Sequence, residues 1–262
     1  MLTSLLRNRT RALLVSGLPV LALLGVAGFA PLPYTLAQPG STADVLGRHK
    51  GQEVITISGA PVDKTDGELR MTTIVATGPR THVDLADVVD GWFRTDRAVL
   101  PHDSVYPPGK SDAEIEKRNL GQMAESQDAA VDAALGYLGK SPKDVKVTLR
   151  LADIGGPSAG LLFALGIVDK LDGGGASLTG GRTIAGTGTI TPDGKVGAVG
   201  GVSLKTQAAA RDGATVFLVP KDECAQARAE RPDGLRLIPV TTLKDAVSSL
   251  RALQRGTKVP SC

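Results

Sequence analysis

The stretch GGPSAG, residues 155–160, places a serine between small residues. Ser158 stands directly before an apolar run, where a serine commonly caps the start of a helix. The same setting suits a nucleophile, because glycine allows close backbone approach and N–H groups at a helix start can stabilise an oxyanion. The residues that would support such a site are Gly156, Ala159 and Gly160. The position alone leaves both interpretations, cap and nucleophile, open.

A serine nucleophile needs a base, and the histidines do not offer an obvious one. All three, His49, His82 and His102, precede Ser158 in the chain. The G-x-S-x-G pattern of α/β-hydrolases requires a histidine after the serine, so that assignment fails. A histidine-first order is formally allowed for His82 or His102, but neither segment carries a supporting triad pattern.

Lysine can act as the base if its surroundings lower its pKa from the ordinary value of about 10.4. Lys170 and Lys221 lie beside acidic residues, and Lys195 lies in a turn that water should reach. Lys205 stands in GGVSLKTQAAA, with no acid nearer than Asp212. Burial among small apolar residues would lower its pKa and favour a neutral amine. The alternative is a surface lysine on an amphipathic helix.

The elements that must position these residues follow from periodicity and turn signals. Strands are expected at 53–58, 69–76, 145–151, 183–190, 214–220 and 235–240, and helices at 82–93, 112–138, 158–170, 203–212 and 242–254. Residues 31–50 and 101–111 are expected to be a linker and a loop. From Lys143 onward the alternation of strands and helices predicts an α/β domain.

The N-terminal segment has its own composition. Arg7, Arg9 and Arg11 precede the uncharged stretch Ala12–Ala30, which is long enough to cross a bilayer with the N-terminus in the cytoplasm. A cleaved signal peptide is the alternative, although Pro31 would hinder cleavage after Ala30. Either interpretation places the body of the protein outside the cytoplasm.

The two cysteines are Cys224 and Cys262. In an exported chain they are candidates for one disulfide, and two free thiols are the alternative. The net charge of +3 and the absence of a basic stripe with interleaved aromatics argue against nucleic acid as a partner.

GGPSAG and GGVSLKTQAAA, in this order, resemble the serine and lysine motifs of the proteolytic domain of Lon proteases, the Ser-Lys peptidases of the S16 class. The resemblance covers about Val145 to Leu253. It implies that Ser158 is the nucleophile and Lys205 the base, and that Thr187, in GTGTI, helps to hold the lysine. It also implies the α/β (α+β) fold of that domain, which is ribosomal protein S5 domain 2-like, and it allows a homo-oligomer.

The segments DGWFRTDRAVLP, VYPPGKSDAEIEKRN and MAESQDAA also resemble the exported, membrane-anchored YlbL-like Lon proteases of actinobacteria. Three features depart from these patterns. First, there is no room for a PDZ domain between Gly139 and Val145. Second, Gly155 stands where bacterial Lon often has an aspartate, and Asp153 lies two residues earlier. Third, Thr189 stands where a glutamate often follows Thr-Gly. GTITPDGKV does not satisfy the P-loop pattern.

The expected organisation is a basic N-terminus (1–11), a transmembrane signal anchor (12–30), a linker (31–50), an N-terminal α/β extension (51–142), a Lon-type proteolytic domain (143–255) and a tail (256–262). The expected function is ATP-independent extracytoplasmic cleavage of flexible or misfolded proteins and peptides, with no cofactor or metal. The membrane is expected as a partner through the N-terminal helix. An inactive Lon-like scaffold or binding module at the cell envelope is the alternative.

Overall fold

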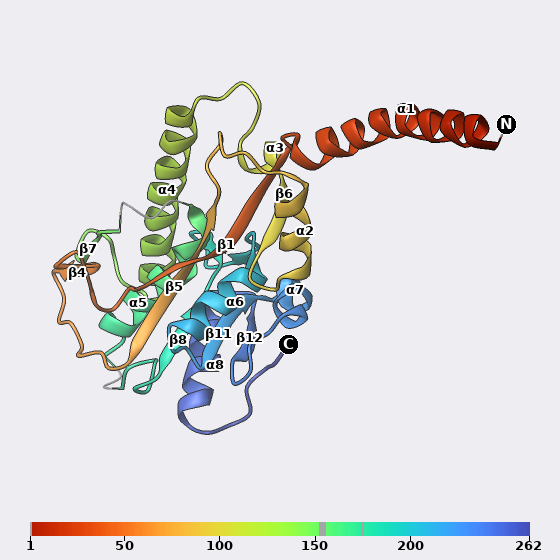
Figure 1. Cartoon of the computed structure of the whole chain (residues 1–262). Helices are drawn as coiled ribbons and strands as arrows, with labels where there is room; N and C mark the ends of the chain where they lie inside the picture. The colour runs from red at the N-terminus through yellow and green to blue at the C-terminus, as the bar shows by residue number, and fades with distance from the viewer. Residues whose placement is uncertain (1, 152–155, 174–175) are drawn as a thin grey trace. The chain divides into compact units, whose positions relative to one another are not determined.

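The computed structural model describes residues 2–151, 156–173 and 176–262, and the side chains of residues 2–15 are not among the parts described (Figure 1). The chain divides into two compact units. Unit 1 contains residues 1–37 and 76–108, and unit 2 contains residues 38–75 and 109–262.

Unit 1 is built on a short antiparallel pair. The first residues of β1 (Tyr34–Asp44) pair with β6 (Ala98–Pro101) from Tyr34 to Ala37. α2 (Leu85–Phe93) begins with a capping box, in which Asp84 and Asp87 accept each other's backbone N–H. The remaining helices are α1 (Leu2–Phe29) and α3 (His102–Val105), which lies in the segment expected to be a loop.

α1 includes the segment that the sequence predicts to cross a membrane. Among the residues described, however, no helix combines the length and the apolarity that a membrane crossing requires. The side chains of Arg7, Arg9 and Arg11 lie outside the described part, so the charge-based orientation stays a prediction.

Residues 31–50 are not a linker, contrary to the expectation from their composition. β1 occupies eleven of these positions, and β2 (Arg48–His49) pairs with β3 (Gln52–Glu53). The strand was missed because Pro39 and Gly40 lie inside it and are usually absent from strand interiors. Its buried positions are Thr35, Ala37, Gly40 and Ala43, so the two-residue period of a regular strand holds only at its start.

The sheet of unit 2 contains four parallel strands in the order β12–β11–β8–β5, and β1 lies beside β5. Their bounds are Glu68–Ala76 for β5, Thr183–Gly186 for β8, Val216–Pro220 for β11 and Arg236–Val240 for β12. β11 is buried on both faces: Val216 and Leu218 pack into one hydrophobic cluster, and Phe217 and Val219 pack into another. Such continuous apolar strands are typical of parallel sheets that are covered on both sides.

Helices cover both faces of this sheet (Figure 1). α4 (Asp112–Leu138), α5 (Gly160–Leu171) and α8 (Leu243–Gln254) pack on the face of Val216 and Leu218. α6 (Val202–Arg211) and α7 (Cys224–Ala229) pack on the other face. The prediction of α4 over residues 112–138 is confirmed, and its start is fixed by a capping box between Ser111 and Glu114.

Shorter elements complete unit 2. β4 (Ile55–Ser58) pairs with β7 (Lys146–Leu149), and β9 (Thr189–Ile190) pairs with β10 (Val196–Gly197). The 3₁₀ turns are η1 (Pro157–Ala159) and η2 (Lys221–Glu223).

Cys224 and Cys262 form a disulfide, which joins the start of α7 to the C-terminal residues. Both cysteines pack against the hydrophobic cluster that contains Phe217 and Val219 of β11. This cluster also contains residues of α6, so the disulfide lies next to the helix that carries Lys205.

Candidate active site

The serine turn, residues 156–160, leads directly into α5. Gly156 has a φ of +102°, a conformation that side-chain-bearing residues rarely adopt, and Ser158 follows within η1. Ser126 of α4 donates a hydrogen bond from Oγ to the carbonyl of Pro157 at 2.9 Å. Ser158 is half-buried, so the turn holds its backbone in place while part of the residue remains accessible.

The serine turn is also joined to the end of β8. Gly188 donates its N–H to the carbonyl of Ser158 at 2.9 Å, and Leu161 donates its N–H to the carbonyl of Gly188 at 3.1 Å. Because Gly188 follows β8 closely, these bonds place Ser158 at the carboxyl end of the parallel strands. In α/β folds, this edge is the usual location of functional sites.

The serine turn requires glycine at position 160, because its surroundings leave no space for a side chain. A Cβ at this position would lie 2.8 Å from Ser126 Oγ and 2.9 Å from Ile190 Cγ2, so α4 and β9 approach the turn too closely for alanine. The N–H of Gly160 donates to the carbonyl of Pro157 and is therefore not free to bind an oxyanion. The N–H groups of Ser158 and of the buried Ala159 remain the predicted donors.

Lys205 projects from the first turns of α6, which starts after Gly201 in the left-handed conformation. Only 3% of Lys205 is exposed, and its burial lowers the pKa of the amine from 10.5 to about 8, against an opposing influence of Glu223. The amine is therefore still mostly protonated at pH 7, and its neutral fraction becomes large as the pH approaches 8. A surface location for Lys205, the alternative left by the sequence, is wrong.

Thr187 connects the lysine to the serine turn. Lys205 Nζ donates to Thr187 Oγ1 at 3.1 Å, and Thr187 Oγ1 donates to the carbonyl of Ser158 at 3.3 Å. Thr187 is fully buried at the end of β8. Within the part of the chain that the structure describes, Ser158 Oγ and Lys205 Nζ make no direct hydrogen bond. Catalytic hydrogen bonds are often long before substrate binds.

The histidines have other surroundings. His82 Nε2 interacts with the carbonyl of Phe29, and His102 Nδ1 interacts with Thr35 Oγ1, both within unit 1. His49 belongs to the β2–β3 pair, and its Nε2 has no hydrogen-bond partner among the described residues. No described hydrogen bond joins any histidine to Ser158.

Two residues of this region were not singled out from the sequence. Ser126 lies in MAESQDAA, where nothing marks a contact with a turn far along the chain. Glu223 lies in η2 and acts electrostatically on Lys205. In the sequence it was one of two acids beside Lys221, and only the fold brings it near a different lysine. Asp153 and Gly155, at which the motif departs from bacterial Lon, lie outside the described residues.

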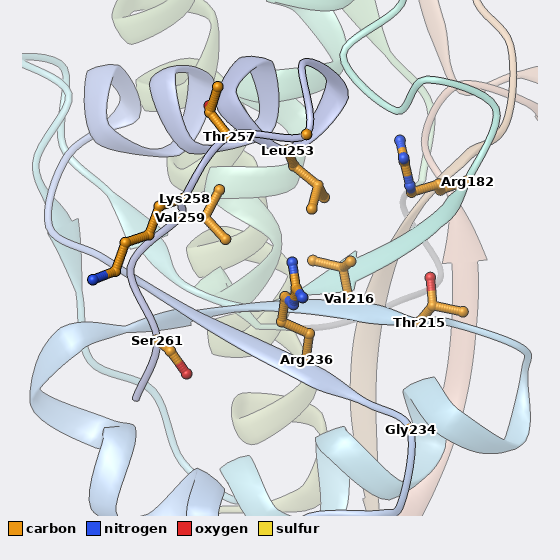
Figure 2. Close-up of a pocket in the computed structure, with 11 residues that line it drawn as sticks. Arg182, Thr215, Val216, Gly234, Arg236, Leu253, Thr257, Lys258, Val259 and Ser261 are labelled. Carbon is orange, nitrogen blue, oxygen red and sulfur yellow. The ribbon is translucent and has the colours of Figure 1, made fainter.

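A cavity of about 760 Å³ lies at the amino ends of the parallel strands, opposite the end at which Ser158 lies (Figure 2). Its lining includes Val216 and Arg236, the first residues of β11 and β12, and Arg182, which precedes β8. In Figure 2 the charged ends of Arg182 and Lys258 extend in different directions on the two sides of Arg236. The cavity is thus at the amino ends of the parallel strands, whereas Thr187 follows the carboxyl end of β8.

Comparison with known proteins identifies the family. Residues 112–251 match the Lon protease (S16) C-terminal proteolytic domain. This chain is 32% identical over 184 residues to the Lon protease of Azospirillum brasilense, which is 63% of this chain and 22% of that protein. It is 30% identical over 131 residues to Lon protease 2 of Bacillus subtilis (strain 168), which is 49% of this chain and 23% of that protein.

A third relative is the Lon protease of Xanthomonas oryzae pv. oryzae, which is 25% identical over 225 residues, or 80% of this chain and 26% of that protein. This chain therefore spans about a quarter or less of the length of these curated relatives. The chain belongs to the Lon protease (S16) family through its proteolytic domain. The family match begins at Asp112, so it includes α4, which the sequence interpretation placed upstream of the domain.

Proposed function

We propose that this chain is a serine endopeptidase in which Ser158 is the nucleophile and Lys205 is the general base. The observation that carries the proposal is the buried contact of Lys205 Nζ with Thr187, whose hydroxyl in turn bonds to the carbonyl of Ser158. Since burial lowers the pKa of Lys205 to about 8, the amine can accept a proton at accessible pH. No histidine takes this role.

The chemistry proceeds in two stages. Ser158 Oγ attacks the peptide carbonyl carbon while its proton moves to Nζ of Lys205, and the resulting ammonium then protonates the leaving amine as the C–N bond breaks. The acyl-enzyme is cleaved by water, whose proton passes to Lys205 and then back to Ser158 Oγ. Thr187 holds the amine in place throughout, and the N–H groups of the serine turn stabilise the oxyanion.

The substrates proposed are flexible peptides, chain ends and misfolded proteins. None of the 262 residues of the sequence forms a segment that fulfils the G-x-x-x-x-G-K-[ST] pattern, which supports our proposal that cleavage by these residues does not depend on ATP. Cleavage of an unstructured peptide by the purified chain should therefore be unchanged by added ATP and magnesium.

We place this activity outside the cytoplasm. The disulfide between Cys224 and Cys262 supports this placement, because such bonds persist in oxidising compartments and are rare in the cytosol. Protease shaving of intact cells tests it: the body of the chain should be degraded without lysis. Resistance to shaving, with Ser158-dependent activity seen only after lysis, would exclude this location.

The direct test of the function is hydrolysis of an unstructured peptide by the full chain and by its Ser158→Ala variant. Cleavage should occur with the unaltered chain and disappear with the variant, while circular dichroism shows the same fold. An inactive scaffold is the second candidate, because it would also explain why Ser158 Oγ and Lys205 Nζ make no direct hydrogen bond in the part of the chain that the structure describes. Absence of both cleavage and serine-probe labelling in a folded sample would establish the scaffold.

A further inference from the structure

Glu223 is a half-buried acid whose hydrogen bonding is incomplete. Its Oε1 accepts the backbone N–H of Val199 at 3.0 Å, whereas Oε2 is inaccessible to water and has no hydrogen-bond partner in the described structure. Burial accordingly raises the pKa of this carboxyl. A buried carboxylate oxygen without a partner is costly unless an opposite charge compensates for it.

The contact with Val199 ties Glu223 to the segment that begins the lysine helix. Val199 lies two residues before Gly201, and Gly201 accepts the backbone N–H of Lys205 at 3.1 Å. The position of Val199 therefore influences where α6 starts and how its first turn presents the lysine. Glu223 fixes this segment from η2, an element that follows α6 and β11 in the chain.

The charges around Lys205 are few. α6 packs against α7, β8 and β11: α7 carries Arg228, and neither β8 (TIAG) nor β11 (VFLVP) contains a titratable side chain. Arg211, at the end of α6, is paired with Asp212. Among the described residues, Glu223 is the charged group that acts on Lys205, and Asp222 acts on Glu223.

We propose that Glu223 is a positioning residue for Lys205: it anchors the start of the lysine helix through Val199 and supplies the compensating negative charge for the lysine ammonium. This inference rests on the proposed function of Lys205 as the base. When Lys205 takes the proton of Ser158, a buried positive charge appears, and the carboxylate of Glu223 stabilises it without contacting the substrate. The base is thereby strengthened while burial keeps part of it neutral.

The disulfide holds this carboxylate in place. Cys224 follows Glu223 directly, and its bond to Cys262 fixes the junction of η2 and α7. Val199, Cys224 and Cys262 pack against the same hydrophobic cluster as Val202 of α6. The disulfide, the carboxylate and the start of the lysine helix therefore form one continuous packed unit.

The test measures the titration of Lys205 directly, by NMR of its side-chain carbon next to Nζ in the full-length protein, assigned with Lys205→Arg. In Glu223→Gln the amide oxygen still accepts the N–H of Val199, but the negative charge is lost. The midpoint of Lys205 should then fall by about half a pH unit or more. The matched control is Asp222→Asn, which removes the neighbouring exposed carboxylate and should leave the midpoint within about 0.2 units, because an exposed charge is well screened.

A reciprocal measurement does not depend on the folding of Glu223→Gln. In Lys205→Met the titration midpoint of the Glu223 carboxyl should rise, because the ammonium that favours its ionised form is gone. Unchanged midpoints in both experiments would overturn the proposal. Both readouts are independent of turnover, so a chain that proves inactive but shows the coupled titration would refute the proposed function and leave the pairing intact.

Discussion

Lys195 and Lys205 lie close together in the chain but have different surroundings, and only the surroundings of Lys205 suit a general base. The ammonium of Lys195, in the turn between β9 and β10, lies 3.0 Å from the carboxylate of Asp193, and 73% of its side chain is exposed. Lys205 is 3% exposed and contacts a buried threonine hydroxyl. The residue type is the same, so the difference in chemistry comes from burial and from the neighbouring groups.

The contrast has a physical origin in the two segments. TPDGK provides an acid and a tight turn, which pair the lysine with a carboxylate and leave it in water. VSLKTQAAAR provides a helix with small residues that packs closely on the sheet, which removes water from the amine. Four predictions use Lys195 or its turn as the internal reference for Lys205.

The largest effect is expected on turnover. Lys205→Ala should lower the kcat of peptide cleavage by about 10³-fold or more, because the proton of Ser158 then has no acceptor. Lys195→Ala should remain within about twofold of the unaltered chain. Ser158→Ala should match Lys205→Ala, and the double variant should be no worse than either, because residues that act as a unit are not additive. Additive losses would show that the two residues act independently.

The next largest effect concerns the disulfide. The double variant Cys224→Ser/Cys262→Ser should lower the free energy of unfolding by about 3–4 kcal/mol, the chain-entropy value for a loop of this length. Denaturant unfolding measures this change. Hydrogen exchange should accelerate in α6 and α7, which pack around the bond, and should stay unchanged in the turn of Lys195. Equal acceleration in both regions would mean that the bond supports the whole unit rather than the lysine helix.

Removing the buried charge should stabilise the fold. At pH 7, Lys205 is mostly protonated in both the folded and the unfolded chain, and its pKa of about 8 rather than 10.5 corresponds to a cost of up to about 3 kcal/mol. Lys205→Met should therefore raise the free energy of unfolding at pH 7. Lys195→Met should change it by about 0.5 kcal/mol or less.

The pH dependence of this gain follows from the direction of the shift. Because the pKa is lowered in the folded state, the original protein gains stability as pH rises from about 8 towards 10.5, where the unfolded chain retains more protons. The increase in the free energy of unfolding that Lys205→Met produces should therefore become smaller as the pH rises from about 8 towards 10.5. An advantage that grows with pH would contradict a buried lysine with a lowered pKa.

The smallest effect is expected at the threonine that holds the amine. Thr187→Val should lower kcat by about tenfold to a hundredfold, the value of one hydrogen bond to a charged group. Thr187→Ser should recover most of the activity, because it keeps the hydroxyl. The reference is Thr191→Val. Thr191 Oγ1 accepts the backbone N–H of Lys195 at 3.1 Å, and removal of this hydroxyl should leave kcat within about twofold of the value for the unaltered chain. Equal effects of the two valine substitutions would remove the special role of Thr187.

The sequence predicted the strands and helices of the serine and lysine segments because local periodicity and turn residues determine them. It missed β1, whose Pro39 and Gly40 hide the strand pattern. The exclusion of Lys195 and the choice of Lys205 also followed from neighbours in the sequence. Ser126 and Glu223 could not be found in this way, because their contacts with Pro157 and Val199 join segments that only the packing of helices brings together.

The measurement that tests the central claim most directly is the reactivity of Ser158 towards a fluorophosphonate probe as a function of pH, with the site of the adduct located by mass spectrometry. In the unaltered chain the labelling rate should rise with pH around a midpoint near 8, as Lys205 becomes neutral. In Lys205→Met the labelling should be abolished, and in Lys195→Met it should be unchanged. Labelling of Ser158 at the same rate and with the same pH profile in Lys205→Met would contradict the account.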